Sequence, residues 1–227
     1  MNINNLVIET TRRCNMECEH CLRGKQEDED MEWQAIFELS EQVDYISTVV
    51  FSGGEPSLNV GVINYFLEVI KRRNVEIGSF YIATNGLDID EQFIITCLRL
   101  YAYCDEKDMC SVEVSNDYFH QVWGSYDTEL LEGLGFFRRK YSQEGHYYDG
   151  NSAINQGRYA ELYSNGRELK ELPIVTRDDF DEAEIYLNTK GQVINGCNWS
   201  YKEQGEHVLC RVEGLTDYYN SLEVEDE

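Results

Sequence analysis

The first two thirds of the chain alternate between two patterns of hydrophobic and polar residues. Short apolar runs are typical of strands buried on both faces. Between them, apolar residues recur every three or four positions, as in a helix with one buried face. This alternation of strand and helix predicts a parallel sheet and an α/β fold. The runs that predict strands span residues 6–8, 49–51, 80–83 and 112–114.

Four helical stripes fill the stretches after these runs. Each stripe places its apolar side chains on one face of a helix, and that face would pack against the sheet. Asn59 stands just before the second stripe and is a suitable N-cap. The stripes are Met31, Ala35, Leu39 and Val43; Val60, Ile63, Leu67 and Ile70; Phe93, Cys97, Leu100 and Cys104; and Leu130, Leu134, Phe137 and Tyr141.

After residue 145 the pattern loosens. Residues 153–158 are predicted to end a fifth strand. From Ala183 the pattern becomes that of a β-hairpin, with strands at residues 184–188 and 192–194 and a turn at residues 189–191. We therefore expect a main α/β unit over residues 1–180 and a small C-terminal hairpin extension over residues 181–227.

Polar or glycine-rich segments follow each of the four predicted strands. The carboxyl ends of parallel strands lie at one edge of a sheet or barrel, and ligands bind at that edge. We therefore expect the four segments to form one site. They contain Cys14, Cys18 and Cys21; residues 52–56; Thr84-Asn85-Gly86; and Ser115-Asn116-Asp117.

The composition excludes some classes of function. The chain has 227 residues, a formal net charge of −24 and a pI near 4.4. This acidity argues against a duplex nucleic acid substrate, because phosphate binding needs a basic surface. It is explained by solubility, or by attraction to a basic partner such as a Lys/Arg-rich peptide. No apolar run approaches the roughly 18 residues of a membrane span and no targeting segment is visible, so we expect no membrane partner and a cytoplasmic protein.

Three cysteines, Cys14, Cys18 and Cys21, stand in the spacing C-x3-C-x2-C within a polar loop. Three thiolates this close together can bind one soft metal centre. They are too few to close a structural zinc site or to saturate a four-iron cluster, so a cubane would keep one iron open for a small molecule. A zinc knuckle with His20 is an alternative, although His20 neighbours Cys21 and would point away from it. A disulfide scaffold is not expected in a chain of this size.

The cysteine spacing resembles the cluster loop of the radical SAM superfamily. The stretch Ser52-Gly53-Gly54-Glu55-Pro56 resembles the motif with which that superfamily binds the methionine part of S-adenosylmethionine (SAM). The resemblance covers residues 5–160 and implies a partial (β/α)6 TIM-like barrel, open on one side for substrate. It also implies a [4Fe-4S] cluster held by Cys14, Cys18 and Cys21, and SAM bound at Gly53, Gly54, Glu55 and Pro56.

The resemblance implies a reaction as well. A flavodoxin or ferredoxin would supply one electron to the cluster, and SAM would break into methionine and a 5′-deoxyadenosyl radical. The radical would then abstract a hydrogen atom from the substrate. In such chemistry the cofactors supply the reactivity, and the protein orients them and excludes water.

Two further strand ends carry expected cofactor-binding residues. Thr84 and Asn85 resemble a turn that contacts ribose or methionine in the superfamily, and a plain strand-to-loop turn is the alternative. Ser115 and Asp117 stand where the superfamily often places a ribose ligand. His120 lies close behind them and is a candidate catalytic residue, with a structural histidine as the alternative.

Arg158 follows Gln156-Gly157, and this stretch resembles the glycine-arginine turn that many superfamily members keep near the adenine or the SAM carboxylate. A guanidinium suits a carboxylate because it can donate two parallel hydrogen bonds. A surface arginine is the alternative. We therefore expect Arg158 to be a cofactor-binding residue.

The remaining cysteines divide into two groups. Cys97, Cys104 and Cys110 fall on a helical stripe or at a strand start, which favours core packing. Cys197 and Cys210 belong to the predicted extension, which resembles the auxiliary-cluster (SPASM or twitch) extension of peptide-modifying members. The chain departs from that pattern, because two thiols alone do not hold a second four-iron cluster. A relic of such an extension, used as a cap over the barrel, is the favoured interpretation.

The resemblance leaves the substrate open. The extension favours modification of a peptide or protein. The alternatives are an activating enzyme that installs a glycyl radical on a partner protein, and modification of a small metabolite or nucleoside. A metal-binding interaction module is the non-enzymatic alternative.

Overall fold

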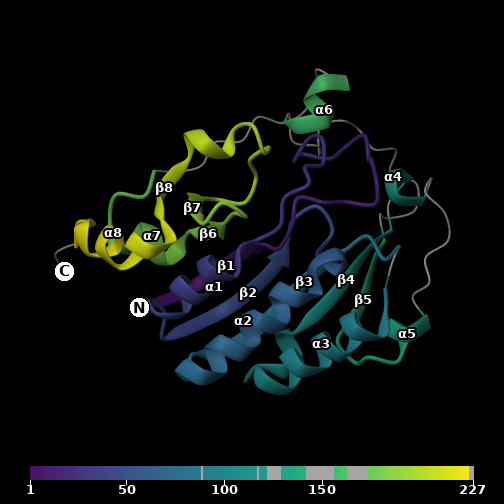
Figure 1. The fold of residues 1–227 in the computed structure, drawn as a ribbon, viewed down its shortest axis with the longest axis horizontal. Helices are drawn as coiled ribbons and strands as arrows, with labels where there is room; N and C mark the ends of the chain where they lie inside the picture. Colours follow the sequence, from purple (N-terminus) through teal and green to yellow (C-terminus); the bar gives the residue numbers. More distant parts are fainter. Residues whose placement is uncertain (88, 117, 122–128, 142–155, 163–172, 225–227) are drawn as a thin grey trace.

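The computed structural model describes residues 1–87, 89–116, 118–121, 129–141, 156–162 and 173–224 (Figure 1). Within these residues the strands form one eight-stranded sheet in the order β5-β4-β3-β2-β1-β6-β7-β8. The strands are β1 (Asn2–Glu9), β2 (Tyr45–Ser52), β3 (Glu76–Thr84), β4 (Ser111–Asn116), β5 (Phe137–Tyr141), β6 (Glu184–Leu187), β7 (Gln192–Asn195) and β8 (Val208–Arg211).

Every neighbouring pair from β5 to β6 is parallel, whereas β7 and β8 are antiparallel additions at one edge. Each of the four apolar runs lies inside one of the strands β1 to β4, and the predicted hairpin forms β6 and β7. The predicted α/β class with a C-terminal hairpin is therefore confirmed. The hairpin continues into β8, which the sequence pattern did not predict.

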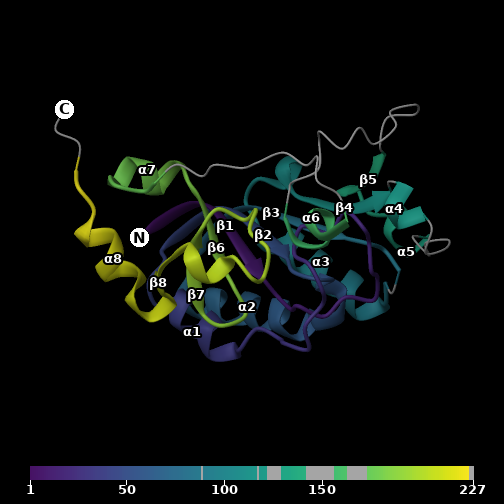
Figure 2. The ribbon, with the colours of Figure 1, turned by 90° about the horizontal axis from the view of Figure 1, so that it is seen from above.

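Helices cover one face of this sheet, and Figures 1 and 2 show α1, α2 and α3 side by side on it. Their buried faces carry most of the first three predicted stripes, including Leu39, Leu67 and Leu100, whereas Met31, Val43 and Cys104 are buried just outside the helices. The helices of the described residues are α1 (Trp33–Ser40), α2 (Val60–Arg73), α3 (Glu91–Tyr103), α4 (Tyr118–Gln121), α5 (Glu129–Glu132), α6 (Gly157–Leu162), α7 (Arg177–Glu182) and α8 (Leu215–Ser221).

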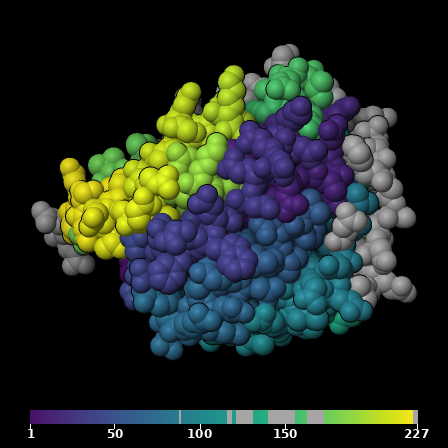
Figure 3. All heavy atoms as spheres, in the orientation of Figure 1, coloured from purple at the N-terminus to yellow at the C-terminus, as the bar shows by residue number. Residues whose placement is uncertain are grey.

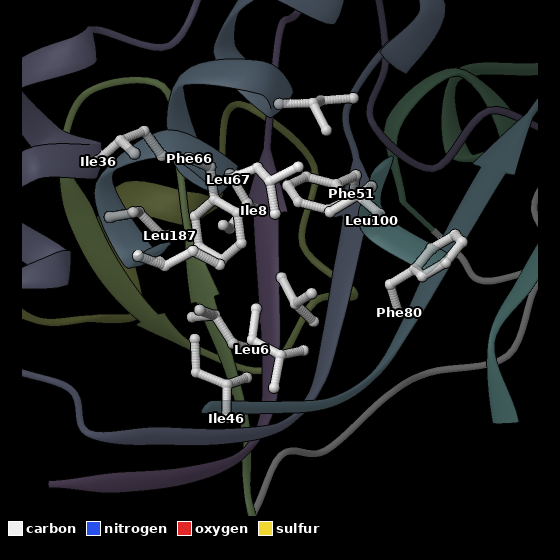
Figure 4. Close-up of a cluster of buried hydrophobic side chains, with 14 of the residues drawn as sticks. Leu6, Ile8, Ile36, Ile46, Phe51, Phe66, Leu67, Phe80, Leu100 and Leu187 are labelled. Atoms are coloured by element: carbon white, nitrogen blue, oxygen red, sulfur yellow. The ribbon is translucent and has the colours of Figure 1, made fainter. Parts of the chain in front are cut away.

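The main core lies between the sheet and these helices. Leu6, Ile8 and Phe51 from the strands meet Phe66 and Leu67 of α2 there, as Figure 4 shows. Each such side chain contributes roughly 1.5–3 kcal/mol when fully buried. Cys97, Cys104 and Cys110 belong to the same core, which confirms their predicted packing role. The core thus fixes the strands whose carboxyl ends carry the polar segments.

Asn59 stands at the N-cap of α2, as predicted, but its side chain makes no cap hydrogen bond. Its amide instead donates to the backbone carbonyl of Thr10 at 2.7 Å. Thr10 directly follows β1, so this contact ties the start of α2 to the segment that leads toward the three cysteines.

Two predictions in the middle of the chain were wrong in part. The fourth stripe predicted a helix through Phe137 and Tyr141, but α5 ends at Glu132 and those residues belong to β5, which pairs in parallel with β4. Gly133 and Gly135 disfavour a continuous helix, and the edge of β4 provides the pairing that overrides the stripe. Of the predicted fifth strand end at 153–158, residues 153–155 lie outside the described residues, and helix α6 begins at Gly157.

The extension is part of the main sheet. Strand β6 pairs in parallel with β1, so the sixth parallel strand lies beside β1 and not beside β5. The sheet therefore runs without interruption across the predicted boundary at residue 180, and that boundary stays a prediction. Among the described residues, no helix has the length and apolar character needed to cross a membrane.

Candidate functional site

A cavity of about 180 Å³ opens at the carboxyl ends of β1 to β4. The polar segments expected to form one site do line this cavity together. Pro56 is not among the lining residues, and Asp117 lies outside the described residues. The predicted residues that line the cavity are Cys14, Cys18, Cys21, Gly53, Gly54, Glu55, Thr84, Asn85, Ser115, His120 and Arg158.

The cysteine segment is held by its own backbone and by α6. The amide of Cys21 donates to the carbonyl of Cys18 at 3.2 Å, which forms a tight turn between two of the three thiols. The amide of Arg158 donates to the Cys21 carbonyl at 3.0 Å, and its guanidinium donates to the Cys18 carbonyl at 3.2 Å. Gly157 permits this approach, because a Cβ there would lie 2.2 Å from the carbonyl oxygen of Leu22.

Arg158 therefore stabilises the turn between Cys18 and Cys21 through two hydrogen bonds. Its predicted contact with the SAM carboxylate stays a prediction.

The three thiols lie around the cavity and do not converge on one point. Within the described ranges, no three Cys, His, Asp or Glu side chains are grouped as ligands of a single metal ion. A four-iron cubane places each thiolate on a different iron, so thiols spread around one cavity fit it. Burial raises the pKa of the Cys14 thiol to about 11. Bound iron would offset this effect, since a metal keeps its thiol ligand deprotonated.

The glycine pair packs directly against the segment that leads to Cys14. The amide of Gly54 donates to the Thr11 carbonyl at 2.8 Å, and the amide of Glu55 donates to the Arg13 carbonyl at 2.9 Å. A Cβ on Gly53 would lie 2.2 Å from the Thr11 oxygen, and one on Gly54 would lie 2.1 Å from the Arg13 oxygen. Gly53 also has a φ of 145°, which favours glycine. Both glycines are thus needed to bring the two loops together.

Glu55 is buried and accepts three hydrogen bonds. Its carboxylate receives the amide of Ser57 at 3.0 Å, the hydroxyl of Thr84 at 2.7 Å and the amide of Asn85 at 2.7 Å. Burial raises the pKa of this carboxyl, and the hydrogen bonds oppose the effect. Glu55 therefore positions the end of β3 at the cavity. Its contact with the SAM ammonium group stays a prediction.

Asn85 connects β3 to the cysteine segment. Its side-chain amide donates to the Asn15 side-chain oxygen at 2.7 Å and lies 3.9 Å from the Cys14 sulfur. Thr84 and Asn85 are both buried at the wall of the cavity. The turn after β3 therefore supports the first cysteine, which the motif alone did not predict.

Two histidines lie together at the cavity. The rings of His20 and His120 meet edge to face with their centroids 5.1 Å apart, and His20 stacks on Phe119 at 4.6 Å. Both histidines line the cavity, as does Ser115 at the end of β4. The sequence pattern indicates His20 only as an alternative zinc ligand. Its place between two cysteines of the motif was the signal that it belongs to the site.

A buried charge network joins the cysteine segment to the extension. Glu9 is fully buried at the end of β1 and accepts hydrogen bonds from Arg12 Nε at 2.7 Å, the Tyr186 hydroxyl at 2.5 Å, Gln204 Nε2 at 2.9 Å and the Thr189 hydroxyl at 3.1 Å. Arg12 lies three residues after Glu9, whereas the other partners come from β6 and the loops after it, 177 to 195 residues away, so no local spacing indicates them. Figure 3 shows the yellow and yellow-green C-terminal atoms seated against the purple N-terminal ones.

Two arginines compensate the Glu9 charge. Arg12 also donates to Glu27 at 2.7 Å, and Arg23 lies over the Tyr186 ring at 4.6 Å and donates to the Trp199 carbonyl at 2.6 Å. Burial raises the pKa of Glu9, but the charges of Arg12 and Arg23 outweigh it and hold this pKa below its ordinary 4.5. Glu9 therefore stabilises the fold at pH values above 4.5, and this contribution is lost as the pH falls.

Glu9→Ala is expected to destabilise the protein by about 3–5 kcal/mol at pH 7, because it strands Arg12 and Arg23 as buried charges. Urea unfolding followed by circular dichroism measures the loss. The difference from wild type should shrink on acidification below pH 4.5. Glu213→Ala is the matched control, since Glu213 pairs with Arg211 at the surface. Equal unfolding curves for the two variants would contradict the role of Glu9.

Cys197 and Cys210 lie on opposite faces of the sheet. Cys197 packs with Tyr186 and Trp199 in a small second cluster, whereas Cys210, opposite Val193 in the ladder, packs against the main core. The two thiols are therefore poorly placed to bind one auxiliary cluster together. The extension continues the main sheet beside β1, and its interpretation as a relic that serves as a cap stays a prediction.

Solved structures with the same fold include the native anSMEcpe protein with bound AdoMet and Cp18Cys peptide. It is 13% identical, with a TM-score of 0.58 over 97% of this chain and 80% of that chain. The same protein with AdoMet and Kp18Cys peptide gives 12% identity and a TM-score of 0.57 over 98% and 81% of the two chains. SuiB from Streptococcus suis reaches a TM-score of only 0.39 at 13% identity, over 85% and 60%. Among curated protein sequences no match was found.

A family model described as the radical SAM superfamily matches residues 8–139, more than half of the chain. The matched stretch contains the three cysteines and the Gly-Gly-Glu-Pro motif, and it ends within β5. Enzymes of this family use a [4Fe-4S] cluster and SAM. The chain belongs to the radical SAM superfamily and is an enzyme that uses these two cofactors.

Proposed function

We propose that this enzyme modifies a peptide or protein substrate by hydrogen abstraction. The observation that carries the proposal is the fold similarity to anSMEcpe with AdoMet and a peptide bound, which covers 97% of this chain and so includes its C-terminal extension. Reductive cleavage of SAM at the cluster supplies the 5′-deoxyadenosyl radical in this superfamily. The residues of this chain bind and orient the cofactors and keep water from them.

In this proposal Cys14, Cys18 and Cys21 hold the cluster. The backbone of Gly53-Gly54, with Glu55 and Pro56 behind it, receives the methionine part of SAM. The support is that the three cysteines and Gly53, Gly54 and Glu55 line one cavity, and that backbone hydrogen bonds join Gly54 and Glu55 to residues 11 and 13.

The remaining predicted site residues bind the other parts of SAM or act on the substrate. Thr84, Asn85 and Ser115 contact SAM from the ends of β3 and β4, together with Asp117, which lies outside the described residues. Arg158 lines the same cavity, beside the cysteine turn. His120 is the candidate catalytic residue at the substrate side.

A flavodoxin or ferredoxin is the proposed electron donor.

The acidic stretch after the cysteines, residues 27–32, is proposed to attract a basic peptide. Glu27 and Asp28 line a second, open pocket beside Cys14, where Arg13 and Lys25 balance their charge. The attraction would therefore come from the net charge of −24 of the whole chain, to which this stretch contributes. Long-range attraction of this kind raises the association rate and weakens with salt.

The test starts from anaerobically reconstituted protein, SAM and dithionite, with 5′-deoxyadenosine measured by chromatography. We expect cleavage of SAM. With a deuterated peptide substrate we expect deuterium in the 5′-deoxyadenosine. Deuterium that enters only from a small metabolite or nucleoside would contradict the peptide proposal. A stable glycyl radical on a large partner protein, seen by electron paramagnetic resonance (EPR), would instead identify an activating enzyme.

A further inference from the structure

Tyr201 of the C-terminal extension lies against the cysteine segment. Its amide donates to the Arg23 carbonyl at 3.1 Å, and Arg23 in turn donates to the Trp199 carbonyl at 2.6 Å. The guanidinium of Arg12 lies 4.5 Å from the centre of the Tyr201 ring. These contacts fix both the backbone and the ring of Tyr201 beside the residues on either side of the three cysteines.

The hydroxyl of Tyr201 is buried and has no hydrogen-bond partner among the residues that the structure describes. A buried donor without an acceptor costs about 1–3 kcal/mol, so such a group calls for an explanation. Tyr201 lines the same cavity as Cys14, Cys18 and Cys21. The cavity therefore offers a place for the missing acceptor.

The hydroxyl keeps its proton and acts as a donor. Burial raises the pKa of Tyr201 well above its ordinary value; the negative charge of Glu9 acts in the same direction, and the charges of Arg23 and Arg12 oppose it only in part. A donor at this place suits an electron-rich acceptor, and the sulfur atoms of an iron–sulfur cluster are such acceptors.

We propose that the Tyr201 hydroxyl donates a hydrogen bond to a sulfur atom of the cluster, so that the C-terminal extension helps to set the reduction potential. The proposal rests on the assignment of Cys14, Cys18 and Cys21 as cluster ligands. A hydrogen bond to sulfur stabilises the reduced cluster more than the oxidised one, because the reduced cluster carries one more electron. Tyr201 is thus a positioning and tuning residue, and SAM is not its acceptor.

The test is Tyr201→Phe in the holoenzyme, with the potential measured by EPR-monitored redox titration without SAM. We expect unchanged iron and sulfide content and a lower potential. The equilibrium constant for reduction should fall by up to about tenfold, which is about 59 mV for a one-electron couple. Tyr103→Phe is the matched control. Tyr103 is the last residue of α3 and does not line the cavity, and its hydroxyl donates to the Val75 carbonyl at 2.6 Å. Its potential should equal that of wild type.

A second variant keeps the proposal testable if Tyr201→Phe does not fold. Replacement of Tyr201 by 3-fluorotyrosine keeps the hydroxyl and makes it a stronger donor, so the potential should rise. An unchanged potential in both variants, with full iron content, would overturn the proposal. Weaker SAM binding at an unchanged potential would overturn it too, because SAM would then be the acceptor. The cysteine assignment is tested separately, by loss of iron in the cysteine variants.

Discussion

Replacement of Cys14, Cys18 or Cys21 by alanine, one at a time, is expected to abolish formation of 5′-deoxyadenosine. Each variant leaves a cubane with only two protein thiolates, and loss of a ligand weakens or prevents cluster assembly. The iron and sulfide content of anaerobically purified protein should fall together with SAM cleavage. Both quantities are measured on the same sample, by chemical analysis and by chromatography.

The matched control replaces Cys197 and Cys210 together. These thiols lie on opposite faces of the sheet, so the double variant should keep the iron content of wild type. A loss of several irons per chain would reveal a second cluster in the extension. Retained activity in all three single variants would refute the assignment of Cys14, Cys18 and Cys21.

The second large effect is expected for Gly54→Ala. The added Cβ would lie 2.1 Å from the Arg13 carbonyl oxygen and 3.0 Å from the Arg12 carbonyl carbon, both of them backbone atoms. The loop that leads to Cys14 must shift to admit the methyl group. We expect a loss of about 3 kcal/mol or more in the free energy of unfolding, together with a lower iron content. Urea unfolding and iron analysis measure the two effects.

Gly61→Ala is the control for this substitution. Gly61 lies in α2, is exposed, and has only Asn59 Oδ1 near its Cβ position, at 3.9 Å. Alanine in a helix is favoured over glycine, so this variant should be as stable as wild type or more stable, by up to about 1 kcal/mol. If both variants were equally stable, close packing of the two loops could not be the reason for the glycine pair.

Local patterns in the sequence predicted the main unit well. Short apolar runs become β1 to β4 because buried side chains of each run, such as Leu6, Phe51, Phe80 and Val112, pack into the main core. The stripe through Phe137 does not form a helix, because Gly133 disfavours it and the edge of β4 offers a strand to pair with. Pairing partners far away in the sequence decide such segments, and a helical period alone does not reveal them.

Site residues were predicted correctly where a motif stands at the end of a strand. Residues that hold the site in place through hydrogen bonds to distant parts of the chain were missed. Thr84 and Asn85 were expected at the cavity, and the structure adds that Glu55 holds them there. The Glu9 network escaped prediction because Tyr186 and Gln204 lie 177 and 195 residues away in the chain. Such long-range hydrogen bonds carry no spacing that a sequence pattern can show.

The central claim is a cluster with three cysteine thiolates and one iron open to SAM. Electron-nuclear double resonance on the reduced protein, with SAM labelled with 15N in its amino group and 17O in its carboxylate, tests it most directly. The account predicts hyperfine coupling of both labels to the cluster. A cluster without such coupling would contradict the account, and so would anaerobically purified protein free of iron and sulfide.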